Sequence, residues 1–169
     1  VAVRSSAPGE DAHGTSFAGL HESFVNIRGT DAIIDHVRLV WASLWSDAAM
    51  LYRKEIGLDV NHSKMAVIVQ EMIDGDRSGV IFTRNPANRN ESVIESVHGL
   101  NQGLVDGIIE PDRWTLETKT GKILSHVPAE RKKCMVAGPQ GILISDLSIQ
   151  KSEIPPLADD DIHKVFEQA

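Results

Sequence analysis

Residues 65–83 have the sequence MAVIVQEMIDGDRSGVIFT, and this stretch decides the fold class. It begins with an apolar run of strand length, continues through an Asp-Gly-Asp segment, and ends in a second strand-like run at 78–83. Two such runs around Asp and Gly are typical of a β-hairpin. The first run is apolar on both faces, so we expect a centrally buried strand. Strand alternation places four of its residues on one face: Ala66, Ile68, Gln70 and Met72.

Strand signals continue on the C-terminal side of this stretch. A strand is predicted at 92–97, and runs at 114–117 and 123–126 predict a further hairpin that turns at Thr120-Gly121. The last residues, 157–169, have the pattern of another helix, with acidic residues in its first turn.

The segment before residue 65 has a helical pattern. Apolar residues recur at helical spacing, which predicts a helix capped by Thr30 or Asp31 that runs through 45, and a second helix from 46 or 47 to 56. Trp41 and Trp45 lie four residues apart on one face of the first helix, and core packing is their expected role. Helices followed by clustered hairpins favour an α+β fold with a largely antiparallel mixed sheet.

Composition excludes several classes of protein. The chain has 169 residues, a net charge of −7 and 41% apolar residues. The acidic balance disfavours a nucleic-acid-binding protein, and no apolar run is long enough to cross a membrane. The single cysteine, Cys134, cannot form an internal disulfide or a cysteine-rich metal site, and it suits a reducing cytoplasm.

Two segments contain residues suited to bind a nucleotide. Arg4 follows a short apolar strand and precedes a loop with glycines at 9, 14 and 19, a pattern that lets a guanidinium and backbone N–H groups approach phosphate. A surface turn with a structural arginine explains the same residues equally well. Gln70-Glu71-Met72 ends the strand in the 65–83 stretch, where amide groups and a thioether can contact a purine, or where the strand simply reaches solvent.

The order of these motifs resembles the ATP-binding domain of the phosphoenolpyruvate synthase and pyruvate phosphate dikinase family. The resemblance covers about the first three quarters of the chain, and Ser16-Phe17-Ala18-Gly19 is closest in style to pyruvate, water dikinase. Its motifs are VAVRSSA at 1–7, Glu10-Asp11, Ser16 to Gly19, Glu22-Ser23, Asn26-Ile27, Trp41 to Leu44, Tyr52-Arg53, Val69 to Met72, Ser78 to Thr83, Asn85-Pro86, Gly99-Leu100 and Pro111-Asp112.

The resemblance implies an ATP-grasp-like fold and a set of ATP contacts. Arg4 would hold the phosphates in a catalytic role, and Gly19 and Ser23 would belong to the phosphate-covering loop. The adenine-side residues would be Gln70, Glu71 and Met72. Ser23 replaces the usual Thr, and Gly99-Leu100-Asn101-Gln102 replaces Gly-Leu-Gly-Glu, which removes an acidic side chain.

The chain is expected to be one partial ATP-binding domain, 1–169, because it begins inside an apolar run and ends within a helix. Residues 1–60 would form a phosphate loop with helices, and residues 61–130 an antiparallel sheet with the adenine-side strand. Residues 131–156 would be an extended linker region, and residues 157–169 the start of a further helix.

The implied activity is a dikinase reaction in which the β-phosphate of ATP passes through a phosphohistidine carrier to pyruvate. The phosphohistidine and pyruvate-binding domains would be other parts of the same protein. Mg²⁺ would bind to residues outside this segment, so we assign no metal ligand here and expect the piece alone to be inactive. None of the 7 histidines lies in a carrier motif. A rifamycin-type or glucan acceptor, or a non-catalytic ATP-binding module, remains as an alternative.

Overall fold

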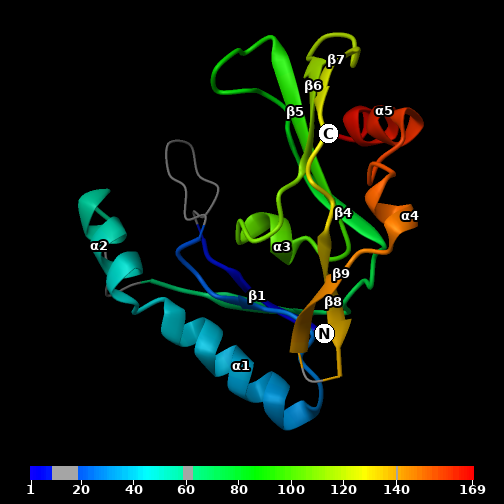
Figure 1. The fold of residues 1–169 in the computed structure, drawn as a ribbon. Helices are drawn as coiled ribbons and strands as arrows, with labels where there is room; N and C mark the ends of the chain where they lie inside the picture. The colour runs from blue at the N-terminus through cyan, green and yellow to red at the C-terminus, as the bar shows by residue number, and fades with distance from the viewer. Residues whose placement is uncertain (9–18, 59–62, 140) are drawn as a thin grey trace. The chain divides into compact units, whose positions relative to one another are not determined.

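The chain folds into two units, Val1–Ile73 and Asp74–Ala169, in a computed structural model (Figure 1). The structure describes residues 1–8, 19–58, 63–139 and 141–169. The predicted α+β class is confirmed, since helices accompany strands that pair almost entirely antiparallel. Each unit has a sheet of its own, so the fold is built around separate sheets rather than one.

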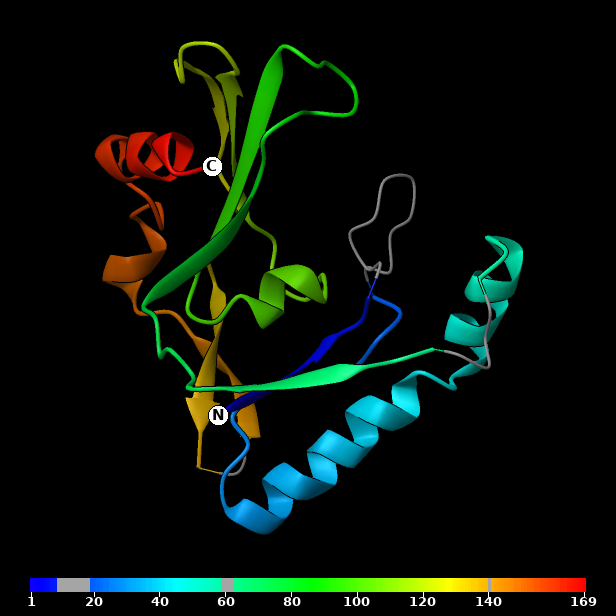
Figure 2. The same ribbon diagram turned by 180° about the vertical axis from the view of Figure 1, so that it is seen from behind.

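The first unit is a small sheet covered by a helix. Strands β1 (Ala2–Ser6), β2 (Ser23–Phe24) and β3 (Ala66–Gln70) form a three-stranded antiparallel sheet in the order β2-β1-β3. Helix α1 (Thr30–Ser43) lies along one face of this sheet (Figure 2). The face is identified by the ring of Phe24, which meets the ring of His36 in α1 at 4.8 Å between centroids.

Helix α2 (Asp47–Glu55) follows α1 with the predicted boundaries. The Ser46 side chain accepts a hydrogen bond from the backbone N–H of Ala49, at 3.2 Å, and so caps the helix. Arg53 is buried and donates to the backbone oxygen of Leu44, at 2.6 Å, just beyond the end of α1. The predicted cap of α1 is wrong: Gly29 is the N-cap, and no side chain caps this helix.

The second unit is centred on a four-stranded antiparallel sheet. Its order is β4-β5-β6-β7. The strands are β4 (Arg77–Phe82), β5 (Glu91–His98), β6 (Asp112–Glu117) and β7 (Ile123–Val127). Helix α5 (Asp159–Glu167) packs on one face through Ile162, which joins Ile94, Trp114 and Leu116 in the buried core. The predicted β6–β7 hairpin and the C-terminal helix are both confirmed.

A second hairpin occupies a region where no strand was expected. Strands β8 (Lys133–Gly138) and β9 (Gly141–Asp146) pair antiparallel, and the short helices α3 (Gln102–Val105) and α4 (Ile149–Ser152) complete the unit. Residues 131–156 are therefore not an extended linker. The end of this region is also held in place, because Arg77 donates to the Pro156 oxygen and His98 contacts the Ile154 oxygen at 3.0 Å.

The hairpin predicted from residues 65–83 is wrong. β3 pairs with β1 along its whole length, whereas β4 pairs with β5 in the other unit. β3 is also an edge strand with mostly exposed residues rather than a buried central strand, because β1 takes the central position and α1 covers a single face. The expected core role of the tryptophans is wrong as well: Trp41 and Trp45 are 50% and 51% exposed.

Candidate functional site

Strand pairing brings three of the predicted site residues onto one face of the first unit. Arg4 lies directly opposite Ser23 of β2 and Ile68 of β3. Gln70 lies opposite Ala2, two residues from Arg4 along β1. Directly opposed residues in an antiparallel sheet point to the same face, and so do residues two apart on one strand. Arg4, Ser23, Ile68 and Gln70 therefore share a face.

This face is the one that α1 leaves uncovered. Val3 and Phe24 are a cross-strand pair on the opposite face, and Phe24 contacts His36 of α1. Val3 is fully buried, whereas Arg4 next to it is exposed. The sheet thus has an apolar face against the helix and a second face that presents the side chains of Arg4, Ser23 and Gln70.

These three side chains have no partner within the described part of the chain. Arg4 forms no ion pair there, and neither the Ser23 hydroxyl nor the Gln70 amide forms a side-chain hydrogen bond. A guanidinium held on a sheet without a carboxylate beside it is free to pair with an anion. A hydroxyl and an amide add groups that can both donate and accept hydrogen bonds.

The remaining predicted site residues are Gly19, which precedes β2, and Glu71 and Met72, which follow β3. Gly19 is exposed and has φ +75°, a left-handed conformation that glycine adopts without strain, so a substitution there would be unfavourable. Glu71 and Met72 follow β3, which ends at Gln70, so strand alternation no longer decides where they point. Glu71 is exposed and Met72 is half-buried. The rest of the predicted phosphate loop, 9–18, lies outside the described residues.

The described residues do not gather a metal site. No group of three or more His, Cys, Asp or Glu side chains within the described ranges could hold a metal ion. Gln102, which replaces the family's acidic residue, begins α3 in the second unit, and its buried side-chain oxygen has no hydrogen-bond partner among the described residues.

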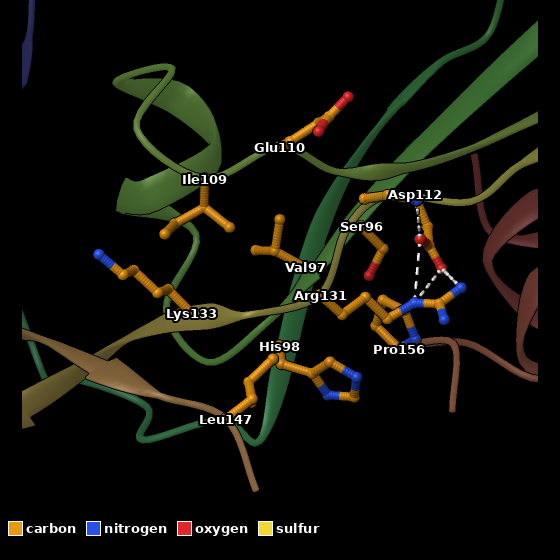
Figure 3. A pocket seen from close by; sticks show the side chains of 11 residues that line it. Ser96, Val97, His98, Ile109, Glu110, Asp112, Arg131, Lys133, Leu147 and Pro156 are labelled. Atoms are coloured by element: carbon orange, nitrogen blue, oxygen red, sulfur yellow. Dashed lines mark hydrogen bonds and ion pairs between the residues drawn. The ribbon is translucent and has the colours of Figure 1, made fainter. Parts of the chain in front are cut away.

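The second unit contains a buried ion pair that the sequence did not predict. The Asp112 carboxylate is fully buried and accepts hydrogen bonds from Arg131 Nε at 2.9 Å, Arg131 Nη2 at 2.7 Å and the Ala129 backbone N–H at 2.7 Å (Figure 3). His126 lies 3.4 Å from the same carboxylate and stacks on Trp114, with ring centroids 4.5 Å apart. The carboxylate is thus fully engaged within the protein.

Residue type alone does not reveal the role of Arg131. It belongs to a short basic run, 131–133, in which a solvated side chain would be usual, but its side chain is only 13% exposed. The His126 side chain is 30% exposed and therefore lies at the surface, with its ring stacked on Trp114 beside the carboxylate. Pro111-Asp112 is one of the motifs that carry the family resemblance. The motif therefore drew attention to Asp112 but did not indicate that its partner is Arg131. The space beside the pair, about 10 Å³, holds no more than a water-sized group, so the cluster is structural.

A larger cavity of about 220 Å³ lies between β4, β5 and α5. Its lining is mainly apolar and includes Val80, Ile81 and Leu157. The one charged residue in its lining, Arg77, already pairs with Asp161 at 2.7 Å. The two serines in its lining are also engaged within the protein: the Ser78 hydroxyl donates to the Gly99 oxygen and the Ser96 hydroxyl to the Ser78 oxygen, both at 2.7 Å.

Comparison with known proteins decides the family. The model of the pyruvate phosphate dikinase AMP/ATP-binding domain matches residues 1–169. The chain belongs to this family. The match covers the whole chain and confirms the resemblance drawn from its motifs.

Similar proteins carry names from the same family. The phosphoenolpyruvate synthase of Pyrococcus furiosus is 40% identical over 142 residues, which are 83% of this chain and 17% of that protein. A probable phosphoenolpyruvate synthase of Methanothermobacter thermautotrophicus is 39% identical over 157 residues, 92% of this chain and 22% of that protein. The rifampicin phosphotransferase of Bacillus cereus is 35% identical over 142 residues, 83% of this chain and 16% of that protein.

The chain therefore spans about a fifth of the length of the curated relatives that it matches. Within the described residues, no helix has both the length and the apolar character needed to cross a membrane. The description of the matching family is an AMP/ATP-binding domain.

Proposed function

We propose that this chain is the nucleotide-binding portion of an ATP-dependent dikinase, and that ATP binds to the β1–β3 face that α1 leaves uncovered. The observation that carries the proposal is the gathering of Arg4, Ser23 and Gln70 on that face without partners in the described chain. The family supplies the ligand class, since its model describes an AMP/ATP-binding domain.

Each residue has a distinct role in this proposal. Arg4 contacts the phosphates through charge-assisted hydrogen bonds, and the Ser23 hydroxyl adds a donor beside it. Gly19 lets the backbone of the preceding loop approach the phosphates. Gln70 binds the edge of the adenine, with Glu71 and Met72 completing the base-side contacts.

The reaction is proposed for the full-length protein and not for this chain alone. The β-phosphate of ATP passes to a histidine in another domain and then to pyruvate, while the γ-phosphate passes to water. By resemblance to the family, the Mg²⁺ ligands belong to a part of the protein outside this segment. A cytoplasmic location is part of the same proposal.

The acceptor has a specific alternative. The relative named rifampicin phosphotransferase is 35% identical to this chain, against 40% for the Pyrococcus furiosus phosphoenolpyruvate synthase. This small difference favours pyruvate and leaves a rifamycin-type antibiotic as the second candidate. A glucan acceptor or a non-catalytic ATP-binding module would keep the same nucleotide face.

Isothermal titration of ATP into the full-length protein tests the nucleotide assignment. Arg4→Ala should weaken ATP binding by about 1.5–3 kcal/mol, the usual worth of a hydrogen bond to a charged group. Arg89→Ala is the matched control, because Arg89 is an equally exposed arginine in a loop of the second unit. Equal ATP affinity in the Arg4 and Arg89 variants would refute the assignment.

A further inference from the structure

The β1–β3 face contains one large apolar residue among otherwise polar or small ones. Strand register assigns seven positions to it, and only Ile68 is both large and apolar; these positions are Ala2, Arg4, Ser6, Ser23, Ala66, Ile68 and Gln70. Ile68 is 48% exposed. Single exposed apolar residues are common on proteins, so the exposure alone indicates nothing. The inference depends instead on the position of Ile68 in the sheet, opposite Arg4.

Ile68 lies at the centre of the groups assigned to ATP. It is the direct cross-strand partner of Arg4, and such pairs have Cβ atoms about 4.5–5.5 Å apart. Gln70 is two residues further along the same strand and face. The apolar side chain therefore lies between the residue assigned to phosphate and the residue assigned to adenine.

Ile68 presents exposed apolar surface beside small side chains. Ala66 precedes it on the same face, and Ala2, which is buried, lies opposite Gln70. The half-exposed surface of Ile68 is therefore the apolar area that this face offers to a ligand. A purine or ribose has an apolar face that would bury this surface, as is usual in small-molecule sites, where apolar contacts accompany a few polar ones.

We infer that Ile68 is a further nucleotide-binding residue, which packs against the nucleoside part of ATP between Arg4 and Gln70. The inference rests on the proposed function and adds a contact that acts on the nucleoside and not on the phosphates. Arg4 and Ile68 should therefore separate two contributions to affinity: the first serves any polyphosphate, and the second serves only a ligand that carries a base and sugar.

The test compares ATP with inorganic tripolyphosphate, which has the phosphates and lacks the nucleoside. Both ligands are titrated into the full-length protein and its variants. Ile68→Thr keeps a β-branched residue on the strand while removing apolar surface. It should weaken ATP binding by about three- to tenfold, as expected for one or two methyl-sized groups, and leave tripolyphosphate binding unchanged. Ile68→Val should retain most of the ATP affinity.

Val69→Thr is the matched control. Val69 is the next residue on β3, is also 48% exposed, and lies on the face toward α1. It should leave binding of both ligands unchanged, which shows that a threonine in this strand is harmless in itself. Retained tripolyphosphate binding in Ile68→Thr shows in the same way that the phosphate contacts remain folded.

The outcomes separate this inference from the proposed function. If Arg4→Ala weakens both ligands while Ile68→Thr leaves ATP affinity unchanged, the nucleotide face stands and the role of Ile68 is wrong. A loss of both ligands by the same factor in Ile68→Thr also overturns it, since the effect would not be specific to the nucleoside. Failure of the unmodified protein to bind either ligand would overturn the proposed function itself.

Discussion

Removing Arg131 should destabilise the second unit far more than removing Arg113, which directly follows its partner Asp112 in the sequence. Arg131 pairs with Asp112, whose side chain is 0% exposed, and two of the guanidinium nitrogens contact the carboxylate at 2.7 and 2.9 Å. Arg113 pairs with Glu95 at 3.4 Å, and these side chains are 51% and 20% exposed. Both are arginine–carboxylate ion pairs, and they differ in how deeply the side chains are buried.

The expected magnitude follows from what each substitution leaves behind. Arg131→Ala leaves a buried carboxylate with the Ala129 N–H at 2.7 Å and His126 at 3.4 Å. An uncompensated buried charge of this kind typically costs about 3–5 kcal/mol. Arg113→Ala breaks a largely exposed pair, for which about 0–1 kcal/mol is usual. The difference between the two variants should therefore be at least about 2 kcal/mol.

Hydrogen exchange followed by mass spectrometry in the full-length protein measures this difference locally. Amides of β6 and β7 should exchange at least about a hundredfold faster in Arg131→Ala, since every 1.4 kcal/mol is a factor of ten. Arg113→Ala should change them much less. A double variant, Asp112→Asn with Arg131→Met, should recover much of the loss because it removes both charges. Similar exchange in the two single variants would refute the view that the buried pair holds this part of the fold.

Two smaller predictions concern the same unit. Burial raises the pKa of the Cys134 thiol, an effect that the charge of Lys151 opposes, so iodoacetamide should modify Cys134 at least about tenfold more slowly in the native protein than after unfolding. Equal modification rates in the native and unfolded protein, measured by peptide mapping, would contradict this prediction. Because the thiol pKa is higher in the folded state, the thiol ionises more readily when unfolded, so alkaline pH destabilises the unit. Gly121→Ala should cost about 1–3 kcal/mol, since Gly121 has φ +69° and an added Cβ would lie 2.7 Å from the Phe166 ring. Gly107→Ala, with φ +68° and no atom within 4 Å of an added Cβ, isolates the backbone contribution, and equal losses of thermal stability would show that the Phe166 contact is unimportant.

Local signals in the sequence were sufficient to locate the three longer helices, α1, α2 and α5, and one hairpin. Ser46 caps α2 and Gly57 follows its end in a left-handed conformation, as the residue types indicate. The β6–β7 hairpin turns within a few residues at Gly121. In each case the residues that decide the structure lie close together in the chain, so pattern and turn chemistry suffice.

Pairing between distant segments could not be predicted in this way. β3 follows β1 by some sixty residues, and its apolar run fits a hairpin with β4 as well as it fits β1. Asp112 and Arg131 are 19 residues apart, and nothing in a short basic run distinguishes the residue that becomes buried. Arg4 and Ser23 were assigned by their motifs, and only the register of β1 with β2 reveals that they are direct partners.

The error about β3 bears directly on the candidate site. In a buried central strand, Gln70 would need hydrogen-bond partners inside the protein, because an unpaired buried amide is costly. At the edge of the β2-β1-β3 sheet, on the face away from α1, the amide does not need a partner inside the protein, and it has none among the described residues. The same position explains why Ile68 is exposed beside Arg4, although an alternating strand with one solvated face would normally place a polar residue there. An exposed apolar residue at that position fits our proposal that this face binds both the nucleoside and the phosphates of ATP.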